Sequence, residues 1–424
     1  MSQPSLPIRR FEFIALAAAL MAANALAIDI MLPAMQQIGE SLGVVDPNHR
    51  QFVVGVYMAG FGIGQLAFGP ISDRFGRRAP LLAGLGIYVA AAFGAALAPT
   101  FPILLAWRAL QGIGAAATRV IGVSLVRDVY VGRRMAEVMS LVMMVFMLVP
   151  ILAPGLGQIV MTVFGEWHAI FVFMGLIGLA VTVWGALRLP ETLPESARRP
   201  FEPKVIAQGF RAVLSHRRSI GYTLASTAVF GGFFGFINSA QQIYVDIYGL
   251  GELFPLFFAG GAGVMALSNF MNSRLVGRFG MRRLSHAALL IFLTVSLILL
   301  LVSLSGPVPL PVFLVLFALA MAQYGCIGAN FGAMAMEPVG HVAGTASSTQ
   351  GFLQTVGGGL LGAALGQAFD GTVTPLAAGF CGLSTVALMM VLMAEGGRLF
   401  GKGEAAPAVD AASPETLGPG TDVV

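Results

Sequence analysis

The chain has 424 residues, of which 57% are hydrophobic and only 10% are charged. A soluble domain carries roughly 25% charged residues, so the composition predicts an integral membrane protein. The net charge of +4 does not imply nucleic-acid binding, because the arginines are dispersed over short segments between apolar stretches. The two cysteines both fall in apolar segments, which argues against a disulfide framework or a zinc cluster.

Twelve apolar stretches are long enough to cross a hydrocarbon core of roughly 30 Å, which takes about 20 residues. We therefore expect an all-α membrane protein with twelve transmembrane helices in two six-helix halves, residues 1–188 and 218–400. Residues 189–217, rich in Pro, Glu and Arg, are the predicted cytoplasmic connector, and residues 401–424 a disordered cytoplasmic tail. The spans are expected to begin near Phe11, Gln51, Pro80, Phe101, Met135, Trp167, Arg218, Leu253, Ser285, Pro309, Val342 and Pro375.

The distribution of Lys and Arg predicts the orientation of these spans. With the N-terminus and every second loop in the cytoplasm, 21 of the 24 basic residues lie on that side or at its helix ends. The exceptions are Arg50, which lies outside, and Arg108 and Arg119, which lie within the fourth span. Both termini are therefore expected in the cytoplasm.

Two opposite charges lie inside predicted spans: Asp29 in the first and Arg108 in the fourth. At 1.5 Å per residue they occupy similar depths in the outer half of the membrane. Charges at this depth are costly and mark function, so we expect Asp29 to exchange protons and Arg108 to bias its charge state. The alternative is that Asp29 only packs the end of its helix before Pro33. Arg119, about three turns beyond Arg108, is either functional or snorkels to the inner boundary.

The ten residues Gly69–Arg78, GPISDRFGRR, separate the second and third spans. Two glycines, a proline, one acid and three arginines cannot lie in hydrocarbon, so they predict a tight aqueous turn. A degraded copy, Leu275–Arg283, follows half a chain later and carries the same Arg-Phe-Gly triplet. A charged turn repeated in this way indicates a duplicated helical bundle, which is typical of secondary transporters.

Uncharged polar and aromatic residues at membrane depth are the candidates for a substrate cavity. Interspersed Phe and Met suit an adaptable, mostly apolar pocket for an amphipathic molecule. The alternative is that such groups bond between helices. The candidates are Asn24, Tyr57, Gln65, Asn238, Gln241, Gln242, Tyr244, Gln323, Tyr324 and Gln354.

Several of these segments resemble signatures of the major facilitator superfamily. GPISDRFGRR is similar to its loop signature between spans two and three. RALQG at Arg108–Gly112 resembles the fourth-span signature of its drug:proton antiporters, and AIDIMLP around Asp29 resembles the first-span signature of the twelve-helix antiporters. The runs Val126–Tyr130, Leu189–Pro194 and Phe236–Gly249 are similar to the Bcr/CflA branch, the bicyclomycin and chloramphenicol resistance type.

The resemblance implies a cytoplasmic charge latch that stabilises the outward-facing state and breaks when the cavity opens inward. The alternative is a positive-inside anchor in which Asp73 only caps the third helix. In the second copy Gly277 stands where Asp73 stands in the first, so the latch is expected to be asymmetric. The implied gate residues are Gly69, Asp73, Arg74, Gly76, Arg77, Arg78 and Asp128.

The fifth span departs from the antiporter pattern Gly-Pro-x-x-Gly-Gly. This chain reads APGLGQ at residues 153–158, so Pro154 and Gly157 are kept and Gln158 replaces the last glycine. Pro150 and Pro154 are still expected to kink the helix. The substitution by Gln158 weakens the expectation of strict antiport.

We therefore expect a multi-pass protein of the bacterial inner membrane that exports small amphipathic or drug-like compounds by proton antiport with alternating access. It is expected to act as a monomer, without cofactor, metal or nucleic acid. An ATP-driven pump is disfavoured because neither Lys204 nor Lys402 lies in a phosphate loop. The five histidines lie singly, which disfavours an enzyme. A proton-coupled symporter, or an exporter of one specific metabolite, remains the alternative on the same fold.

Overall fold

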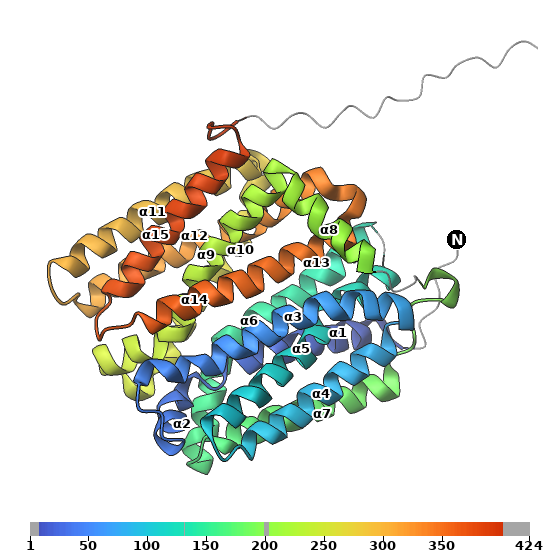
Figure 1. Cartoon of the computed structure of the whole chain (residues 1–424), viewed down its shortest axis with the longest axis horizontal. Coiled ribbons are helices and arrows are strands. Elements are labelled where there is room, and N and C mark those ends of the chain that lie inside the picture. Colours follow the sequence, from blue (N-terminus) through green and yellow to red (C-terminus); the bar gives the residue numbers. More distant parts are fainter. Residues whose placement is uncertain (1–7, 131, 199–202, 402–424) are drawn as a thin grey trace, which may run out of the picture.

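The computed structural model of the chain describes residues 8–130, 132–198 and 203–401. These residues form helices and connecting segments, with no strand among them. Figure 1 shows long helices lying side by side. The predicted tail lies outside the described residues, apart from residue 401.

Eleven helices within the described residues are long and apolar enough to cross a membrane. They are α1 (Arg10–Asp29), α3 (Phe52–Phe75), α4 (Arg78–Ala96), α5 (Phe101–Val129), α6 (Gly132–Phe164), α7 (His168–Arg188), α9 (Arg217–Gln241), α10 (Phe254–Phe279), α11 (Met281–Leu304), α12 (Leu310–Met336) and α15 (Thr374–Ala394). Shorter elements connect them: η1 (Leu32–Ala34), α2 (Met35–Ser41), η2 (Pro47–Gln51), η3 (Glu195–Ala197), α8 (Pro203–Ser215), η4 (Gln242–Ile247), η5 (Gly251–Leu253) and η6 (Glu337–Val342).

The eleventh predicted span is helical but divided into three pieces. It consists of α13 (Ala343–Phe352), the π-helical turn η7 (Leu353–Gly357) and α14 (Gly358–Gln367). A second π-helical turn, η4, follows α9. A π turn adds a residue to a helical turn and changes the direction of the side chains beyond it, and such turns are frequent at functional sites. The described residues thus contain eleven to twelve candidate spans, which confirms the all-helical membrane fold.

Small residues bring α3 and α5 into close contact. A Cβ added at Gly60 would overlap the carbonyl group of Ala109, and one added at Gly112 would overlap the carbonyl of Tyr57. Helices in a membrane associate mainly through close packing of this kind. The close approach places the part of α5 that carries Arg108 directly against α3.

Figure 1 shows helices α1 to α7 grouped in the lower part of the view and α9 to α15 in the upper part. Two lines of contact join the groups. The helix α3 packs against α13, η7 and α14, and α6 packs against α10.

The charged segment Gly69–Arg78 is not the ten-residue turn that its composition predicts. The helix α3 continues through Pro70 to Phe75, and only two residues separate it from α4. A helix that projects beyond the hydrocarbon has its free backbone groups hydrated, so charged residues there need not leave the helix. The turn itself is the pair Gly76 and Arg77.

A glycine with positive φ makes this turn and its copy. Gly76 has a φ of 88°, and Gly280, between α10 and α11, has a φ of 79°. Only glycine adopts such a conformation without a steric penalty. The repeat seen in the sequence is therefore also a repeat of backbone geometry.

The predicted connector contains a helix, α8, that its composition did not indicate. This helix packs against α13. Phe210 meets Phe352 edge to face with ring centres 5.9 Å apart, and Val213 is buried with Val339 and Ala346. Burial of one apolar face stabilises this short helix. The Pro, Glu and Arg content of the segment does not predict it, because the stabilising contacts come from α13.

Candidate functional site

Asp29 is the last residue of α1, at the point where the chain passes towards η1. Its side chain is only 4% exposed. Its Oδ1 has no hydrogen-bond partner among the described residues, and no described cation lies within ion-pair distance of the carboxylate. A buried carboxylate with neither a counter-charge nor a full set of hydrogen bonds does not stabilise a fold. The position of Asp29 therefore indicates a chemical role and not a packing role.

Arg108 is completely buried on α5 and is held mainly by backbone groups. Its Nε donates to the carbonyl of Val53 at 3.2 Å, and its Nη2 donates to the carbonyl of Ala27 at 3.0 Å. Its Nη1 donates to Oε1 of Gln111 at 2.6 Å. Arg108 therefore reaches α1 two residues before Asp29, at a similar depth, but the two side chains form no direct ion pair.

A tyrosine completes this buried polar layer. The guanidinium carbon of Arg108 lies 4.4 Å from the centre of the Tyr57 ring, a cation–π contact. The Tyr57 hydroxyl donates to Oδ1 of Asn24 at 2.8 Å. Side chains of α1, α3 and α5 are thus joined into one network next to Asp29.

The helix α6 reaches the end of α1 through Gly157. A Cβ at this position would overlap the carbonyl oxygen of Ile30, the residue directly after Asp29. Pro150 and Pro154 lie within the same helix. The glycine retained from the antiporter motif therefore sets the distance between α6 and the backbone that carries the buried carboxylate.

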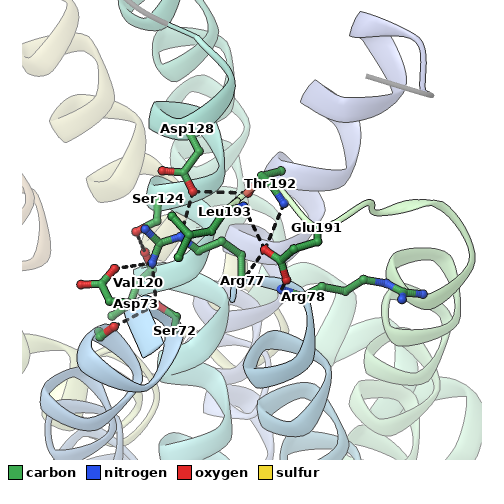
Figure 2. A network of polar contacts seen from close by, with 11 residues as sticks. Ser72, Asp73, Arg77, Arg78, Val120, Ser124, Asp128, Glu191, Thr192 and Leu193 are labelled. Carbon is green, nitrogen blue, oxygen red and sulfur yellow. Dashed lines mark hydrogen bonds and ion pairs between the residues drawn. The ribbon is translucent and has the colours of Figure 1, made fainter. Parts of the chain in front are cut away.

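Arg77 is the centre of a charged network where α3 leads into α4, and Figure 2 shows its partners. The side chain is 3% exposed. Its Nη1 lies 2.6 Å from Oδ1 of Asp73 and donates to Ser72 Oγ at 2.8 Å, while its Nε lies 2.8 Å from Oδ2 of Asp128. Burial by itself would lower the pKa of Arg77, but Asp128 and Asp73 outweigh it and hold the pKa above its usual value.

Glu191, which follows α7, completes this Arg77 network in Figure 2. Its carboxylate accepts hydrogen bonds from the backbone N–H groups of Arg77 at 2.8 Å and Arg78 at 3.1 Å, so it caps the first turn of α4. It also accepts from the N–H groups of Thr192 and Leu193, both at 3.0 Å. Nothing local in the sequence indicates this role of Glu191, because the capped N–H of Arg77 lies 114 residues earlier in the chain.

Two predicted gate residues differ from Arg77. Arg74 is exposed and makes no hydrogen bond or ion pair with any described residue. The guanidinium of Arg78 donates to the carbonyl of Ala186 at 2.6 Å. The members of the network belong to α3, α4, the turn between them, α5 or the segment after α7, so it does not bridge to the other group of helices. On α3, Gly69 faces Ser348 of α13.

A second charged network lies at the corresponding turn between α10 and α11. Arg282 stands two residues after Gly280, as Arg78 stands two residues after Gly76. Its Nε lies 2.9 Å from Oε1 of Glu395, and its Nη2 lies 3.1 Å from Oε2 of Glu337. The two networks differ in their members, since the central arginine comes from different positions of the repeated turn.

Glu395 also accepts a hydrogen bond from the hydroxyl of Tyr222 at 2.7 Å. Burial opposes ionisation of Glu395, but the bonds from Tyr222 and Arg282 outweigh it and hold its pKa below the usual value. Nδ1 of His286 accepts from the N–H of Phe400 at 3.1 Å, so Nε2, 3.0 Å from the Tyr222 oxygen, carries the ring proton and donates. A chain of hydrogen bonds thus runs from the segment after α15 to α9 and α11.

At the opposite end of the molecule, amide side chains join the two groups of helices. Nε2 of Gln51 donates to Oε1 of Gln242 at 2.5 Å and to the carbonyl of Gly366 at 3.1 Å. Nε2 of Gln242 donates to Oδ1 of Asn48 at 2.8 Å. Nδ2 of Asn48 donates to the carbonyl of Phe369, also at 2.8 Å. We call these five residues the Asn48 cluster. It closes the end of the molecule where η2 and α14 meet.

Most of the predicted substrate residues bond to the protein itself. Four residues are exceptions. Oδ1 of Asn238 and the hydroxyls of Tyr244 and Tyr324 are buried without a partner among the described residues. Gln241 is buried and forms no hydrogen bond with described residues through its side chain. The six that bond to protein are Asn24 with Tyr57, Gln65 with Thr355, Gln242 within the Asn48 cluster, Gln323 with the carbonyl of Leu319, and Gln354 with Ser226.

Comparison with known proteins adds independent information. The family model described as Major Facilitator Superfamily matches residues 15–363. The chain is 30% identical over 354 residues to the Bicyclomycin resistance protein homolog of Haemophilus influenzae, covering 82% of this chain and 87% of the relative. It is 30% identical over 342 residues to the Multidrug resistance protein MdtL of Escherichia coli, covering 78% of this chain and 83% of the relative. The xylose transporter XylE of E. coli, in a partially occluded inward-open conformation, has the same fold at 13% identity, with a TM-score of 0.70 over 92% of this chain and 99% of that chain.

The chain belongs to the Major Facilitator Superfamily. Its similarity to bicyclomycin and multidrug resistance proteins confirms the predicted resemblance to the Bcr/CflA type. It is a transporter of small molecules and not an enzyme, and a multi-pass protein of the bacterial inner membrane.

Proposed function

We propose that this transporter exports small amphipathic, drug-like compounds in exchange for protons, with Asp29 as the proton-binding group. The observation that carries the proposal is the burial of the Asp29 carboxylate without a counter-charge. An ionised carboxylate in such a place is costly, and a bound proton removes the cost. The names of the relatives, which refer to bicyclomycin and multidrug resistance, support drug-like compounds as substrates.

Arg108 couples the charge of Asp29 to the position of α1. Its guanidinium bonds to α1 at Ala27 and to α3 at Val53. When Asp29 loses its proton, the new negative charge lies two residues from Ala27 and attracts the same guanidinium. The bonds that hold α1 against α3 and α5 therefore compete with an ion pair, and protonation decides between them.

Alternating access requires the two ends of the pathway to open in turn. In our proposal residues 1–188 and 218–400 form two six-helix halves that move against each other, with both termini in the cytoplasm. The Asn48 cluster is then the outer contact between the halves, and the packing of α3 against α13 is the inner one. The Arg77 network keeps the inner ends of α3, α4 and α5 together as one body during this motion. One chain supplies the whole pathway, so the transporter works as a monomer.

The test uses the purified protein in liposomes with an imposed pH gradient and a fluorescent dye as substrate. The wild type is expected to move dye against its gradient in proportion to the pH difference. Asp29→Asn, which keeps the shape but not the titrating group, is expected to lose this pH dependence while its melting temperature stays close to that of the wild type. Asp370→Asn, an exposed carboxylate in a loop, is the matched control and is expected to transport normally. Unchanged pH-driven transport by Asp29→Asn contradicts the proposal, and dye movement along with the protons indicates a symporter.

A further inference from the structure

Arg119 is a second guanidinium within α5 for which the proposed mechanism has no use. It follows Arg108 by about three helical turns, so the two lie within roughly 20° of each other around the helix. This face contacts α1 and α3 at Arg108, and one turn beyond Arg119 it meets α1 again, where Gly122 faces Met21. Arg119 therefore points into the bundle and not towards lipid.

The direction of the Arg119 side chain, and not its depth, distinguishes it from a snorkelling residue. The helix α5 has 29 residues, about 43 Å, and is longer than a hydrocarbon core of roughly 30 Å, so its end with Asp128 lies in the Arg77 network. A snorkelling side chain extends along its helix to the interface. Arg119 instead contacts the ring of Phe146 on α6.

Arg119 and Arg108 differ in their surroundings. Arg108 is completely buried and donates to three oxygens, whereas Arg119 keeps part of its surface accessible. The guanidinium carbon of Arg119 lies 5.9 Å from the centre of the Phe146 ring on α6. No described carboxylate forms an ion pair with Arg119, and no described group accepts a hydrogen bond from it. Its donors are therefore free for a ligand.

The charges inside the described spans do not balance. Asp29 is one carboxylate against the two guanidiniums of Arg108 and Arg119. Three acids at the ends of spans in the other group of helices lie beside arginines: Asp246 is 3.9 Å from Arg50, and Glu337 and Glu395 both pair with Arg282. An uncompensated charge at membrane depth is costly, so a negative group supplied from outside stabilises this site.

We propose that Arg119 binds the anionic group of the transported compound, and that the substrate class is amphipathic organic anions such as aryl carboxylates. This inference rests on the proposed export function and names its substrate class. A guanidinium binds a carboxylate through two parallel hydrogen bonds. The ring of Phe146, with Met143 one turn before it on α6, offers an adaptable apolar surface for the body of the compound. An inorganic anion lacks the apolar part that this surface accommodates.

The test uses two probes with one body, dansylglycine, which carries a carboxylate, and dansylglycinamide, which is neutral. Apparent affinities are obtained from the rise in melting temperature of the detergent-solubilised full-length protein with increasing probe concentration. The wild type is expected to bind dansylglycine about tenfold more tightly than dansylglycinamide, as one charge-assisted contact provides. Arg119→Gln is expected to bind both probes equally, and Arg119→Lys to keep part of the preference.

Arg127→Gln is the matched control, because it removes the same charge from the exposed end of α5 and is expected to keep the full preference. Arg119→Met, which suits apolar surroundings, replaces Arg119→Gln if the latter does not fold. The inference is overturned if the wild type shows no preference or binds neither probe, or if the preference survives in Arg119→Gln. Anion preference without proton-driven transport contradicts only the proposed function, and proton-driven dye transport without anion preference contradicts only this inference.

Discussion

Arg108 donates a hydrogen bond of 3.0 Å to the carbonyl of Ala27, two residues before Asp29, and forms no ion pair with the carboxylate of Asp29. A backbone carbonyl stabilises the guanidinium through its dipole but leaves the acid without a counter-charge. In the proposed mechanism Arg108 holds α1 in position while Asp29 binds the proton.

Replacement of Arg108 tests the first task. Arg108→Ala removes the side-chain donor to the carbonyls of Ala27 and Val53 and leaves a buried cavity, so the free energy of unfolding is expected to fall by about 2–4 kcal/mol and proton-driven dye transport to stop. Arg108→Lys has a single ammonium group that cannot reach three acceptors in a fixed fork, so it is expected to retain only weak transport. Thermal unfolding and liposome transport measure the two effects. Normal proton coupling in Arg108→Ala removes Arg108 from the mechanism.

The close approach of α6 to α1 predicts a strong effect of one methyl group. Gly157→Ala is expected to overlap the Ile30 carbonyl, to destabilise the protein by about 1–3 kcal/mol and to reduce transport by displacing the backbone next to Asp29. Gly155→Ala, on the same helix, has nothing within 4 Å of the added methyl group and is the control. Melting temperatures and transport rates of the two variants are compared. Equal behaviour of both variants shows that the α6 contact does not position Asp29.

Glu191 provides a test of the Arg77 network. Glu191→Gln keeps the shape of the side chain but loses the charge that caps α4, and we expect a loss of about 0.5–1 kcal/mol in the free energy of unfolding. Glu195→Gln removes an exposed charge four residues away and is expected to change stability little. Denaturation of both variants in the same detergent gives the comparison. A stability of Glu191→Gln equal to the wild type shows that the cap is not needed.

Glu395 predicts a pH dependence of stability. Because its pKa is lower in the folded protein than in the unfolded chain, its ionised form stabilises the fold at pH values above the unfolded pKa of about 4.3. This contribution is lost as the pH falls through the folded pKa. The wild type is expected to melt at a higher temperature than Glu395→Gln at pH 7, and the difference is expected to shrink below about pH 4. A difference that stays constant with pH assigns the effect to packing and not to charge.

Most of the membrane architecture could be predicted from the amino-acid sequence, because hydropathy is a property of contiguous residues. The segments that begin near Phe101 and Pro309 match the starts of α5 and α12 within a residue. Asp29 and Arg108 could be predicted as functional candidates for a similar reason. A charge within an apolar stretch is costly in any packing arrangement of the helix, so the local sequence is sufficient to identify it. The family resemblance was equally a matter of short contiguous motifs.

The pairing of the polar groups could not be predicted from the sequence, because it depends on how the helices pack. Arg108 bonds to Ala27, Glu191 caps α4, and Arg282 pairs with Glu395 because helices remote in the sequence pack side by side. Partners of this kind depend on the rotation and separation of whole helices, which are set by close contacts such as that of Gly157 with Ile30. The π turns and the helix α8 depend likewise on the surfaces against which they pack. Local composition determines which residues enter the membrane, and helix packing determines which of their charges remain unpaired.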